Sequence, residues 1–424
     1  MKILIFINSL SLGGTEKAAC YWAVGLQGRG HSISVLSLRD GPRKKFLEDA
    51  GIDVKISEPK ADLIRDQLLL IAPDVIHAHG PGTVHEGDVL GKAIESLDRK
   101  IPVVQTNVFG RLENPAENFW TDFRLFISWT SCVQAARRAG KKIDLTFFRT
   151  QSVAVYPVDF VSDVKLQELR QAAAKLRLEW GVLDDEILFG RFSRPEPNKW
   201  TDLPLQGFLK ASEKDKKIKL LLREPPPLVA DALQKSEIGS RVLILPATAH
   251  AEELQISQMA CDAVLHGSSI GESFGYGIAE LMALAKPVVV NSTPWQDQAQ
   301  IELVSHGVCG FQASTVKATT RALLQLAADA TLRHHMGEAA RKRISAIADP
   351  ETSLGKLEQA LHCAVKGTAN PTASQDLLAA QEALSLLDRN QYGHELDEYL
   401  ALFPFDRRVR FSRWRKRVYE KLKS

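Results

Sequence analysis

The chain has 424 residues and a formal net charge of +3, and its length predicts two or three domains with substantial cores. Its composition, 45% hydrophobic and 25% charged residues, is that of a soluble globular enzyme, and the small net charge argues against nucleic acid as a partner. The five scattered cysteines argue against a disulfide framework or a zinc site and favour a reducing cytosol. No apolar stretch approaches the roughly 18 residues of a membrane span, so we expect a cytoplasmic protein that is at most peripheral to the inner face of a membrane.

Short apolar runs alternate with helical segments from the start of the chain. The predicted strands cover residues 2–7, 32–38, 75–79, 102–108, 125–129 and 153–158. Helices are predicted between them, for example at 15–29 and 60–71. Strands that are hydrophobic throughout are typical of a parallel sheet covered on both faces. Residues 1–160 are therefore expected to form a doubly wound, Rossmann-like α/β domain.

A second series of the same kind follows a polar, alanine-rich helix, which we expect to link the two halves at 161–182. The strands of this series are predicted at 186–193, 217–222, 241–246, 262–267 and 287–292. Residues 183–350 are therefore predicted to form a second Rossmann-like domain. Two such domains in one chain imply that they face a cleft, and ligands usually bind in clefts of this kind.

The remainder of the chain is predicted to be helical. Residues 351–366 are expected to form a helix that returns to the first domain, and 367–424 a linker followed by a basic amphipathic helical tail. The stretch GTANPTAS, at 367–374, has the composition of a linker.

The tail from Arg407 onward carries nine Lys or Arg residues and one acid, a net charge of +8, so the remaining residues carry −5 of the total of +3. Phe411, Trp414, Val418 and Leu422 follow one another at spacings of 3, 4 and 4, which is one stripe of a helix. Such a helix suits an anionic membrane surface, where each basic residue contributes ~1 kcal/mol. The alternative is a terminal helix that docks on the protein with its charges in water.

The run GESFGYGIAELMALAKPVVV, 271–290, is the most informative stretch of the chain. Glu272 and Glu280 are eight positions apart, Gly275 and Gly277 lie between them, and a buried valine strand follows. The glycines permit close approach of a ligand to the backbone, and the first turn of a helix attracts anions. Ionised carboxylates accept hydrogen bonds from hydroxyls. The run therefore predicts a pocket for a phosphorylated sugar.

The two glutamates also suggest a glycosidase pair, whose carboxyl groups lie ~5–9 Å apart across the sugar. Eight residues of ideal helix span ~12 Å and turn ~80° away from the starting face. Only an arrangement with Glu272 in a loop and Glu280 in the following helix brings both to one ligand.

Two further loops carry candidate anion-binding groups. Arg191 and Lys199 lie in GRFSRPEPNKW, after the first strand of the second series, where a guanidinium fork and a mobile ammonium suit a diphosphate. The alternative is two solvated surface charges. Gly13 and Gly14 lie between the first strand and the first helix and form a candidate anion loop, although they do not match the dinucleotide-binding fingerprint.

The histidines of the strand predicted at 75–79 have two interpretations. His77 and His79 alternate with Ala78, so both face one side of the sheet near a strand end. Beside a cleft they would contact substrate, and otherwise they are satisfied histidines of the sheet.

Taken together, these residues resemble the family 4 retaining glycosyltransferases (glycosyl transferases group 1) of the GT-B fold. The resemblance covers about residues 1–366 and is strongest over 186–311. It implies an acceptor-side first domain and a donor-side second domain, and the C-terminal helical extension lies beyond it. It also implies the following functions for the matching residues. Arg191 and Lys199 would hold the diphosphate, Glu272 the donor sugar and Glu280 the ribose, while Gly13, Gly14, Phe274, Gly275 and Tyr276 would complete the donor site.

One position departs from the family pattern. The family often has a histidine near the reacting sugar at the end of the strand predicted here at 102–108, whereas this chain has QTNVFG there. Asn107 is the nearest polar residue, so His79 and Asn107 are the candidate acceptor-side residues.

The resemblance implies a hexosyltransferase-type enzyme (EC 2.4). It would move a sugar, with retention, from a nucleotide-diphosphate sugar to a hydroxyl of a glycan or lipid-linked acceptor in cell-surface polysaccharide or glycoconjugate synthesis. We expect no cofactor and no metal, because the basic residues would replace a divalent ion. Another GT-B nucleotide-sugar enzyme, such as an epimerase, and a non-catalytic scaffold that binds nucleotide sugar or membrane are the alternatives.

Overall fold

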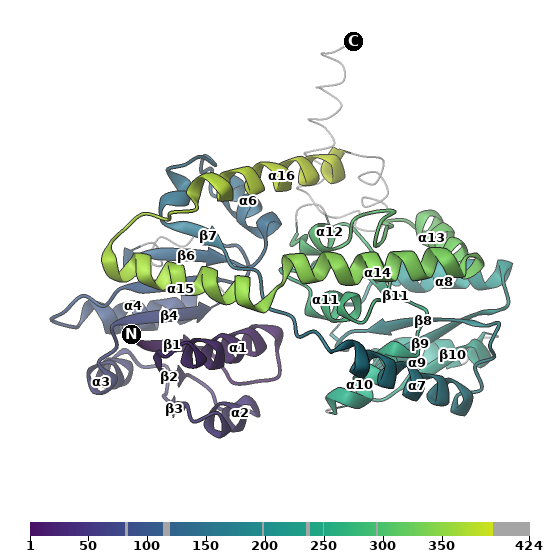
Figure 1. Cartoon of the computed structure of the whole chain (residues 1–424), viewed down its shortest axis with the longest axis horizontal. Coiled ribbons are helices and arrows are strands. Elements are labelled where there is room, and N and C mark those ends of the chain that lie inside the picture. Colours follow the sequence, from purple (N-terminus) through teal and green to yellow (C-terminus); the bar gives the residue numbers. More distant parts are fainter. Residues whose placement is uncertain are drawn as a thin grey trace, which may run out of the picture. The chain divides into compact units, whose positions relative to one another are not determined.

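The computed structural model describes residues 1–80, 84–112, 119–196, 199–234, 238–248, 250–293 and 296–392. These form two compact units, each a parallel sheet with helices around it (Figure 1). Unit 1 contains Met1–Pro157 and Ala348–Leu384, and unit 2 contains Val158–Ile347 with the last described residues, 385–392. The basic tail at 407–424 lies outside the described residues.

Unit 1 is built on seven parallel strands in the order β3-β2-β1-β4-β5-β6-β7. The strands are β1 (Lys2–Ile7), β2 (Ser32–Ser37), β3 (Asp53–Ile56), β4 (Val75–Gly80), β5 (Val103–Asn107), β6 (Phe123–Phe126) and β7 (Gln151–Val153). The chain order reverses between β1 and β4, where Ile5 pairs with both Val35 and His77. This doubly wound topology agrees with the prediction for the first half of the chain.

The helices of unit 1 cover the sheet and bury its apolar strands. They are α1 (Gly14–Gly28), α2 (Arg43–Asp49), α3 (Ala61–Ile71), α4 (Val84–Glu95), α6 (Trp129–Arg138), the 3₁₀ helix η1 (Phe147–Arg149), α15 (Pro350–Lys366) and α16 (Ala373–Tyr392). A central cluster joins Leu4 and Ile76 of the strands to Leu68 of α3 and Leu90 of α4. The strands predicted at 125–129 and 153–158 begin two residues earlier than expected. Ser128 accepts a hydrogen bond from the Ser131 N–H and starts α6, so β6 ends at Phe126.

Unit 2 has six parallel strands in the order β10-β9-β8-β11-β12-β13. The strands are β8 (Ile187–Phe192), β9 (Ile218–Arg223), β10 (Val242–Leu245), β11 (Ala263–His266), β12 (Val288–Val290) and β13 (Gly310–Gln312). The helices are α7 (Asp163–Glu179), α8 (Asp202–Lys214), α9 (Pro227–Gln234), η3 (Gly239–Arg241), α10 (Ala251–Met259), α11 (Tyr276–Ala283), α12 (Ala299–Leu303), α13 (Val316–Ala328) and α14 (Ala330–Ile347). The order reverses between β8 and β11, so the strand ends that carry Arg191 and His266 are neighbours.

The helix predicted as a link between the halves, α7, packs within unit 2. Its apolar residues Leu166 and Leu169 form a cluster with Met259 and Leu284. The guanidinium of Arg341 also donates to the Val161 carbonyl oxygen just ahead of the helix, at 2.8 Å. Burial of one helical face therefore makes α7 a component of this unit's core.

Helix α15 belongs to unit 1, although it follows unit 2 in the chain. The indole of Trp22 donates to the Ser353 hydroxyl at 3.0 Å in a buried contact. Arg29 and His31 both contact the Glu358 carboxylate, at 2.6 and 2.8 Å. These contacts attach the returning helix to α1 and to the turn that precedes β2.

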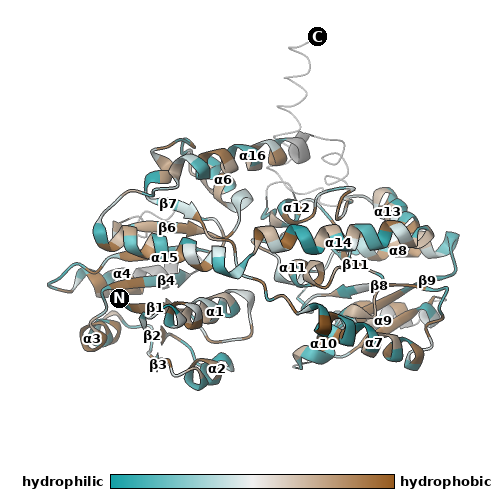
Figure 2. Cartoon of the chain, viewed as in Figure 1, coloured by the Kyte–Doolittle hydropathy of each residue, from teal (hydrophilic) through white to brown (hydrophobic). Residues whose placement is uncertain are grey.

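Residues 367–372, whose composition predicts a linker, are tied to unit 1. Asn370 is 4% exposed and donates to the Gln151 carbonyl oxygen at 3.0 Å and to the Asp376 carboxylate at 2.9 Å. Asp376, 2% exposed, also accepts from the Ser152 hydroxyl and the Lys356 ammonium. Figure 2 shows hydrophobic and hydrophilic residues alternating around α16, as expected for a helix with one buried face. The stretch connects α15 with α16, and its polar residues satisfy buried groups of the fold.

None of the described helices is both long and apolar enough to cross a membrane.

Candidate donor-binding site

A cluster of charged side chains lies at the carboxyl edge of the unit 2 sheet. The Lys199 ammonium contacts both carboxylate oxygens of Glu272 at 2.9 Å, and His266 Nε2 lies 3.1 Å from Glu272 Oε1. Arg191 Nη2 donates to the carbonyl oxygens of Lys199, at 2.9 Å, and Gly267, at 2.6 Å. The fold therefore brings together three of the predicted residues, Arg191, Lys199 and Glu272.

Arg191 is buried with two donors unused. Its side chain is 1% exposed, and its guanidinium carbon lies 4.1 Å from the centroid of the Trp200 ring. Burial lowers the pKa of Arg191 to about 9, partly opposed by the charge of Glu272, so the group is cationic at pH 7. Its Nε and Nη1 have no hydrogen-bond partner in the described part of the chain. Because unpaired buried donors are costly, this cation is suited to receive an anionic ligand.

Glu272 is an ionised carboxylate despite its burial. Burial raises the pKa of its carboxyl group, whereas the hydrogen bond from His266 and the ammonium of Lys199 lower it, and the net pKa is about 2. Burial lowers the pKa of His266, so the imidazole is neutral at pH 7 and donates its Nε2–H to the carboxylate. The cluster thus keeps one carboxylate charged without protonating the histidine.

The loop that carries Glu272 is fixed through its backbone. The Glu272 N–H donates to the Gln300 side chain at 3.0 Å, and the Glu272 carbonyl oxygen accepts from the Ala299 N–H at 2.8 Å. Both partners belong to α12, which thereby determines where the carboxylate lies. Gln300 is 1% exposed and also donates to the Asn291 carbonyl oxygen.

The start of α11 follows this loop, and its N-cap residue has a backbone conformation that favours glycine. Gly275 is the N-cap residue with φ +95°, in the left-handed region that favours glycine. Phe274 is 2% exposed and packs edge-on against Tyr276, with ring centroids 5.0 Å apart. Glu280 lies further along α11 and is partly buried, whereas Glu272 lies in the loop ahead of it. This is the loop-plus-helix arrangement that the spacing of the glutamates requires.

Gly13 and Gly14 lie at the start of α1 in unit 1, as predicted. Gly13 is the N-cap residue with φ −68°, and no side chain caps the helix there. The carboxylate of Glu16 accepts hydrogen bonds from the Ser9 and Ser11 hydroxyls at 2.7 and 3.0 Å. The candidate anion loop therefore contains a carboxylate of its own in the first turn of the helix.

His79 is held inside unit 1. It is 1% exposed, its Nε2 lies 2.7 Å from the Tyr156 hydroxyl oxygen, and its ring packs against those of Trp22 and His77. Burial, with a smaller contribution from His77, holds the pKa of His79 well below its usual range. In the described structure His79 is thus a neutral member of a buried ring cluster.

Asn107, at the end of β5, is also fully buried. Its amide oxygen accepts from the Arg111 N–H at 2.8 Å, and its amide nitrogen donates to the Arg111 carbonyl oxygen at 2.5 Å. The side chain therefore braces the turn that follows β5.

Sequence reasoning missed two members of the cluster, His266 and Trp200. His266 ends β11, one of the strands whose carboxyl end borders the site, six residues before Glu272. Its place at a strand end was the available signal, because ligands of doubly wound folds bind at the carboxyl ends of the strands. Trp200 directly follows Lys199, and nothing in the sequence shows that its ring lies under Arg191.

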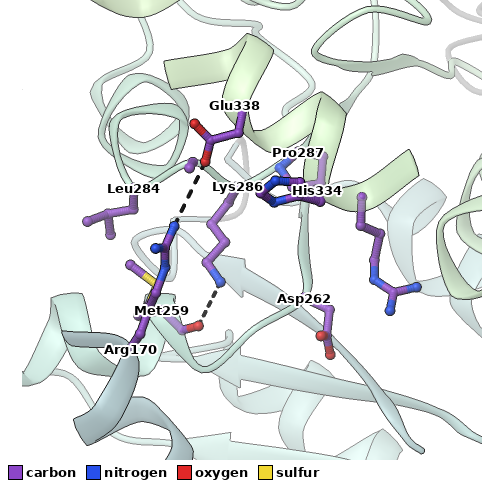
Figure 3. Close-up of a pocket in the computed structure, with 10 residues that line it drawn as sticks. Arg170, Met259, Asp262, Leu284, Lys286, Pro287, His334 and Glu338 are labelled. Atoms are coloured by element: carbon purple, nitrogen blue, oxygen red, sulfur yellow. Dashed lines mark hydrogen bonds and ion pairs between the residues drawn. The ribbon is translucent and has the colours of Figure 1, made fainter. Parts of the chain in front are cut away.

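A second charged cavity lies at the opposite edge of the unit 2 sheet, near the amino ends of β11 and β12, and has a volume of about 190 Å³. Figure 3 shows Lys286 pointing to the Met259 carbonyl oxygen and Arg170 pointing to Glu338, contacts of 2.7 and 3.8 Å. Arg333 donates to two carbonyl oxygens at the end of α13. These cations have structural partners, and none of them is among the buried groups left unpaired in the described residues, as Nε and Nη1 of Arg191 are.

Part of the charged cluster lies in a segment that matches a known protein family. Residues 228–343 match the family model described as glycosyl transferases group 1. The matched segment includes His266, Glu272 and Glu280, whereas Arg191 and Lys199 precede it. No curated protein matches the chain in a sequence search.

Solved structures with the same fold cover most of the chain. HepE from Anabaena in complex with UDP is 20% identical, with a TM-score of 0.68 over 85% of this chain and 100% of its own. A glycosyltransferase from Rickettsia africae is 14% identical, with a TM-score of 0.69 over 87% of this chain and 99% of its own. WaaG, described as a glycosyltransferase involved in lipopolysaccharide biosynthesis, is 12% identical, with a TM-score of 0.61 over 85% and 99%. The chain thus has the GT-B fold, and residues 228–343 match the glycosyl transferases group 1 model.

Proposed function

We propose that the chain is a retaining glycosyltransferase that moves a sugar from a nucleotide-diphosphate sugar to a hydroxyl of a glycan or lipid-linked acceptor. The observation that carries this proposal is the fully buried Arg191, whose two unused donors lie in the same cluster as the Lys199–Glu272 pair. The structures of HepE with UDP and with UDP-glucose support a uridine-diphosphate sugar as the first donor to test. The description of WaaG supports an acceptor in cell-surface polysaccharide synthesis.

In this proposal the diphosphate lies against Arg191 and Lys199. Arg191 offers Nε and Nη1, and the Lys199 ammonium retains one of its three N–H donors beyond the two contacts with Glu272. Both cations are held in place before the ligand arrives, Arg191 by two backbone carbonyls and Lys199 by Glu272. Donors that are already oriented need no reorganisation as negative charge develops.

The carboxylates bind the two ends of the donor. Glu272 accepts hydrogen bonds from the sugar hydroxyls, and Glu280, on α11, accepts them from the ribose. With a pKa of about 2, Glu272 remains an acceptor throughout the neutral pH range. Neither carboxylate transfers a proton in this mechanism.

The chemical step breaks the bond between the anomeric carbon and the diphosphate oxygen, whose electron pair leaves with the nucleotide diphosphate. The acceptor hydroxyl forms the new bond on the same face of the sugar, and its proton passes to the departing diphosphate. Arg191 and Lys199 stabilise the charge on the leaving group without a metal. Added EDTA should therefore leave the transfer rate unchanged, and loss of transfer that Mg²⁺ or Mn²⁺ restores would contradict this part of the proposal.

The site is tested with Lys199→Ala and Glu280→Ala in the full chain. A thermal-shift screen of nucleotide sugars first identifies the donor, and trial acceptors follow. Both variants should lose transfer while circular dichroism shows a folded protein. The loss for Lys199→Ala should be at least about 100-fold, because removing one preorganised donor typically costs 10²–10³ in rate. Lys217→Ala, an exposed lysine of the same unit, is the control. Wild-type transfer in both site variants would overturn the assignment, and product formation without an acceptor would indicate an epimerase.

A further inference from the structure

A groove in unit 2 runs along the seam between α8 and α13, away from the donor site. Lys210 and Lys214 of α8 line one side of it, and residues of α13 between Val316 and Ala328 line the other. Its volume is about 730 Å³, within the range of ligand-binding pockets. Figure 1 shows the two helices next to each other. We call it the α8–α13 groove.

The seam is shaped by a close contact between the helices at Gly207. A Cβ atom at this position would lie 2.4 Å from the Thr319 methyl carbon, so only glycine permits the observed approach. The Thr320 hydroxyl also lies 3.3 Å from the Gly207 carbonyl oxygen. The groove is therefore formed by two well-packed helices and is a fixed feature of the fold.

The floor of the groove is apolar. Val316 and Leu324 are partly exposed there, and Ala328 is exposed at the end of α13. Lysines also line the groove, and an aliphatic lysine stem can cover apolar surface while its ammonium stays in water. An apolar floor that is exposed to water is suited to a partner with an apolar part that can cover it.

The rim of the groove is cationic. Lys210 pairs with Glu213, whereas Lys214, Lys317 and Arg321 have no ion-pair partner among the described residues. Helix α13 contains no acidic residue at all. Its two cations are therefore available to an anionic partner.

We infer that the α8–α13 groove binds an anionic phospholipid of a membrane surface. The unpaired cations suit a phosphate headgroup, and the apolar floor suits the adjoining acyl chain. A free phosphate would leave the floor uncovered. The groove has no aromatic side chain on which a nucleic-acid base would stack. This inference depends neither on the basic tail nor on the proposed transfer reaction.

The test is co-sedimentation of the full chain with vesicles of phosphatidylglycerol and phosphatidylcholine, and with phosphatidylcholine alone. The variant carries Lys317→Gln with Arg321→Gln. Its partitioning onto the anionic vesicles should be about 30-fold weaker, because each basic residue near such a surface contributes ~1 kcal/mol. Partitioning onto pure phosphatidylcholine should be weak for every protein. A second variant, Gln325→Glu, adds one negative charge at an exposed position of the groove and should also weaken partitioning.

The control carries Lys175→Gln with Lys342→Gln, two exposed lysines on α7 and α14 that remove the same total charge. All the proteins keep the basic tail, so the difference between the double variants isolates the groove. Equal loss in the control and groove variants would overturn the inference. A groove variant that binds vesicles normally but no longer binds poly-glutamate would also overturn the inference, because the partner would then be an acidic peptide. Vesicle binding is measured without any sugar donor, so its outcome is separate from that of the transfer assay.

Discussion

At the scale of single residues, the Lys199–Glu272 pair shows burial and charge acting in opposite directions. Burial alone would favour a neutral carboxylic acid, but His266 and Lys199 keep Glu272 ionised. Arg191 lies in the same cluster and is cationic at pH 7, because its pKa, which burial lowers to about 9, remains above that pH. The cluster therefore combines two fixed cations with one fixed anion, an arrangement that can bind a charged ligand without a change of protonation.

The ionisation of Glu272 predicts a pH dependence of stability. Its folded-state pKa, about 2, is below the ordinary value of 4.5, so the stabilisation is present above pH 4.5 and is lost as the pH falls towards 2. The full contribution is on the order of 3 kcal/mol, since one pKa unit corresponds to about 1.4 kcal/mol. Denaturant unfolding of wild type and Glu272→Gln should differ most at pH 7, and the difference should shrink below pH 4.5. A pH-independent difference would show that the charge of Glu272 does not stabilise the fold.

At the scale of elements, the start of α11 depends on one glycine. Gly275 has φ +95°, and a Cβ atom there would lie 3.3 Å from the Glu272 Cβ atom. Gly277, in the first turn of the same helix, has an ordinary backbone conformation, and a Cβ atom there would lie no closer than 3.8 Å to any other group. Only the first glycine is therefore required by the backbone.

Gly275→Ala should lower the free energy of unfolding by about 1–2 kcal/mol, the cost of a left-handed conformation for an L-residue. Gly277→Ala should leave it unchanged or raise it by about 0.5–1 kcal/mol, because alanine is the better helix former. Urea unfolding of both variants provides the comparison. A Gly277→Ala protein as unstable as Gly275→Ala would show that packing, and not φ, explains the cost.

At the scale of the whole molecule, the two units contain different sets of buried titratable groups. In unit 1, burial lowers the pKa of His77 to about 3 and holds that of His79 well below its usual range. In unit 2, burial also lowers the pKa of His266, but the carboxylate of Glu272 opposes the effect. Lowering the pH from 7 to 5 should therefore destabilise unit 1 more than unit 2.

The buried histidines are neutral in the folded state and are protonated more readily in the unfolded state. Lowering the pH therefore favours the unfolded state. Their contribution is complete above the ordinary pKa of 6.5 and is lost as the pH falls, by about 2 kcal/mol at pH 5 for His77 alone. Hydrogen exchange at pH 7 and pH 5, corrected for intrinsic rates, should show greater loss of protection in 1–157 than in 158–347. His77→Gln should reduce that loss, and a greater loss in unit 2 would contradict the prediction.

The sequence alone predicted both doubly wound sheets, because buried parallel strands are recognisable as short, wholly apolar runs. It also predicted that Glu272 precedes a helix containing Glu280, since Gly275 and Gly277 mark the helix start. These features depend on residues that are close in the sequence. The packing of α7 into unit 2 and of residues 367–372 onto unit 1 depends on partners far away in the chain, such as Leu284 and Gln151.

The residues of the site also divide into those recognisable from the sequence and those revealed only by the fold. The sequence singled out Arg191, Lys199 and Glu272 as residues with suitable chemistry at strand ends and in loops. Only the tertiary structure revealed that His266 completes the cluster, that Trp200 lies beneath Arg191, and that His79 is enclosed by Trp22, His77 and Tyr156. Composition and spacing determine which groups are available, whereas burial and hydrogen-bond partners depend on segments that meet only when the sheets form. Those contacts decide which of the available charges are left to bind a ligand.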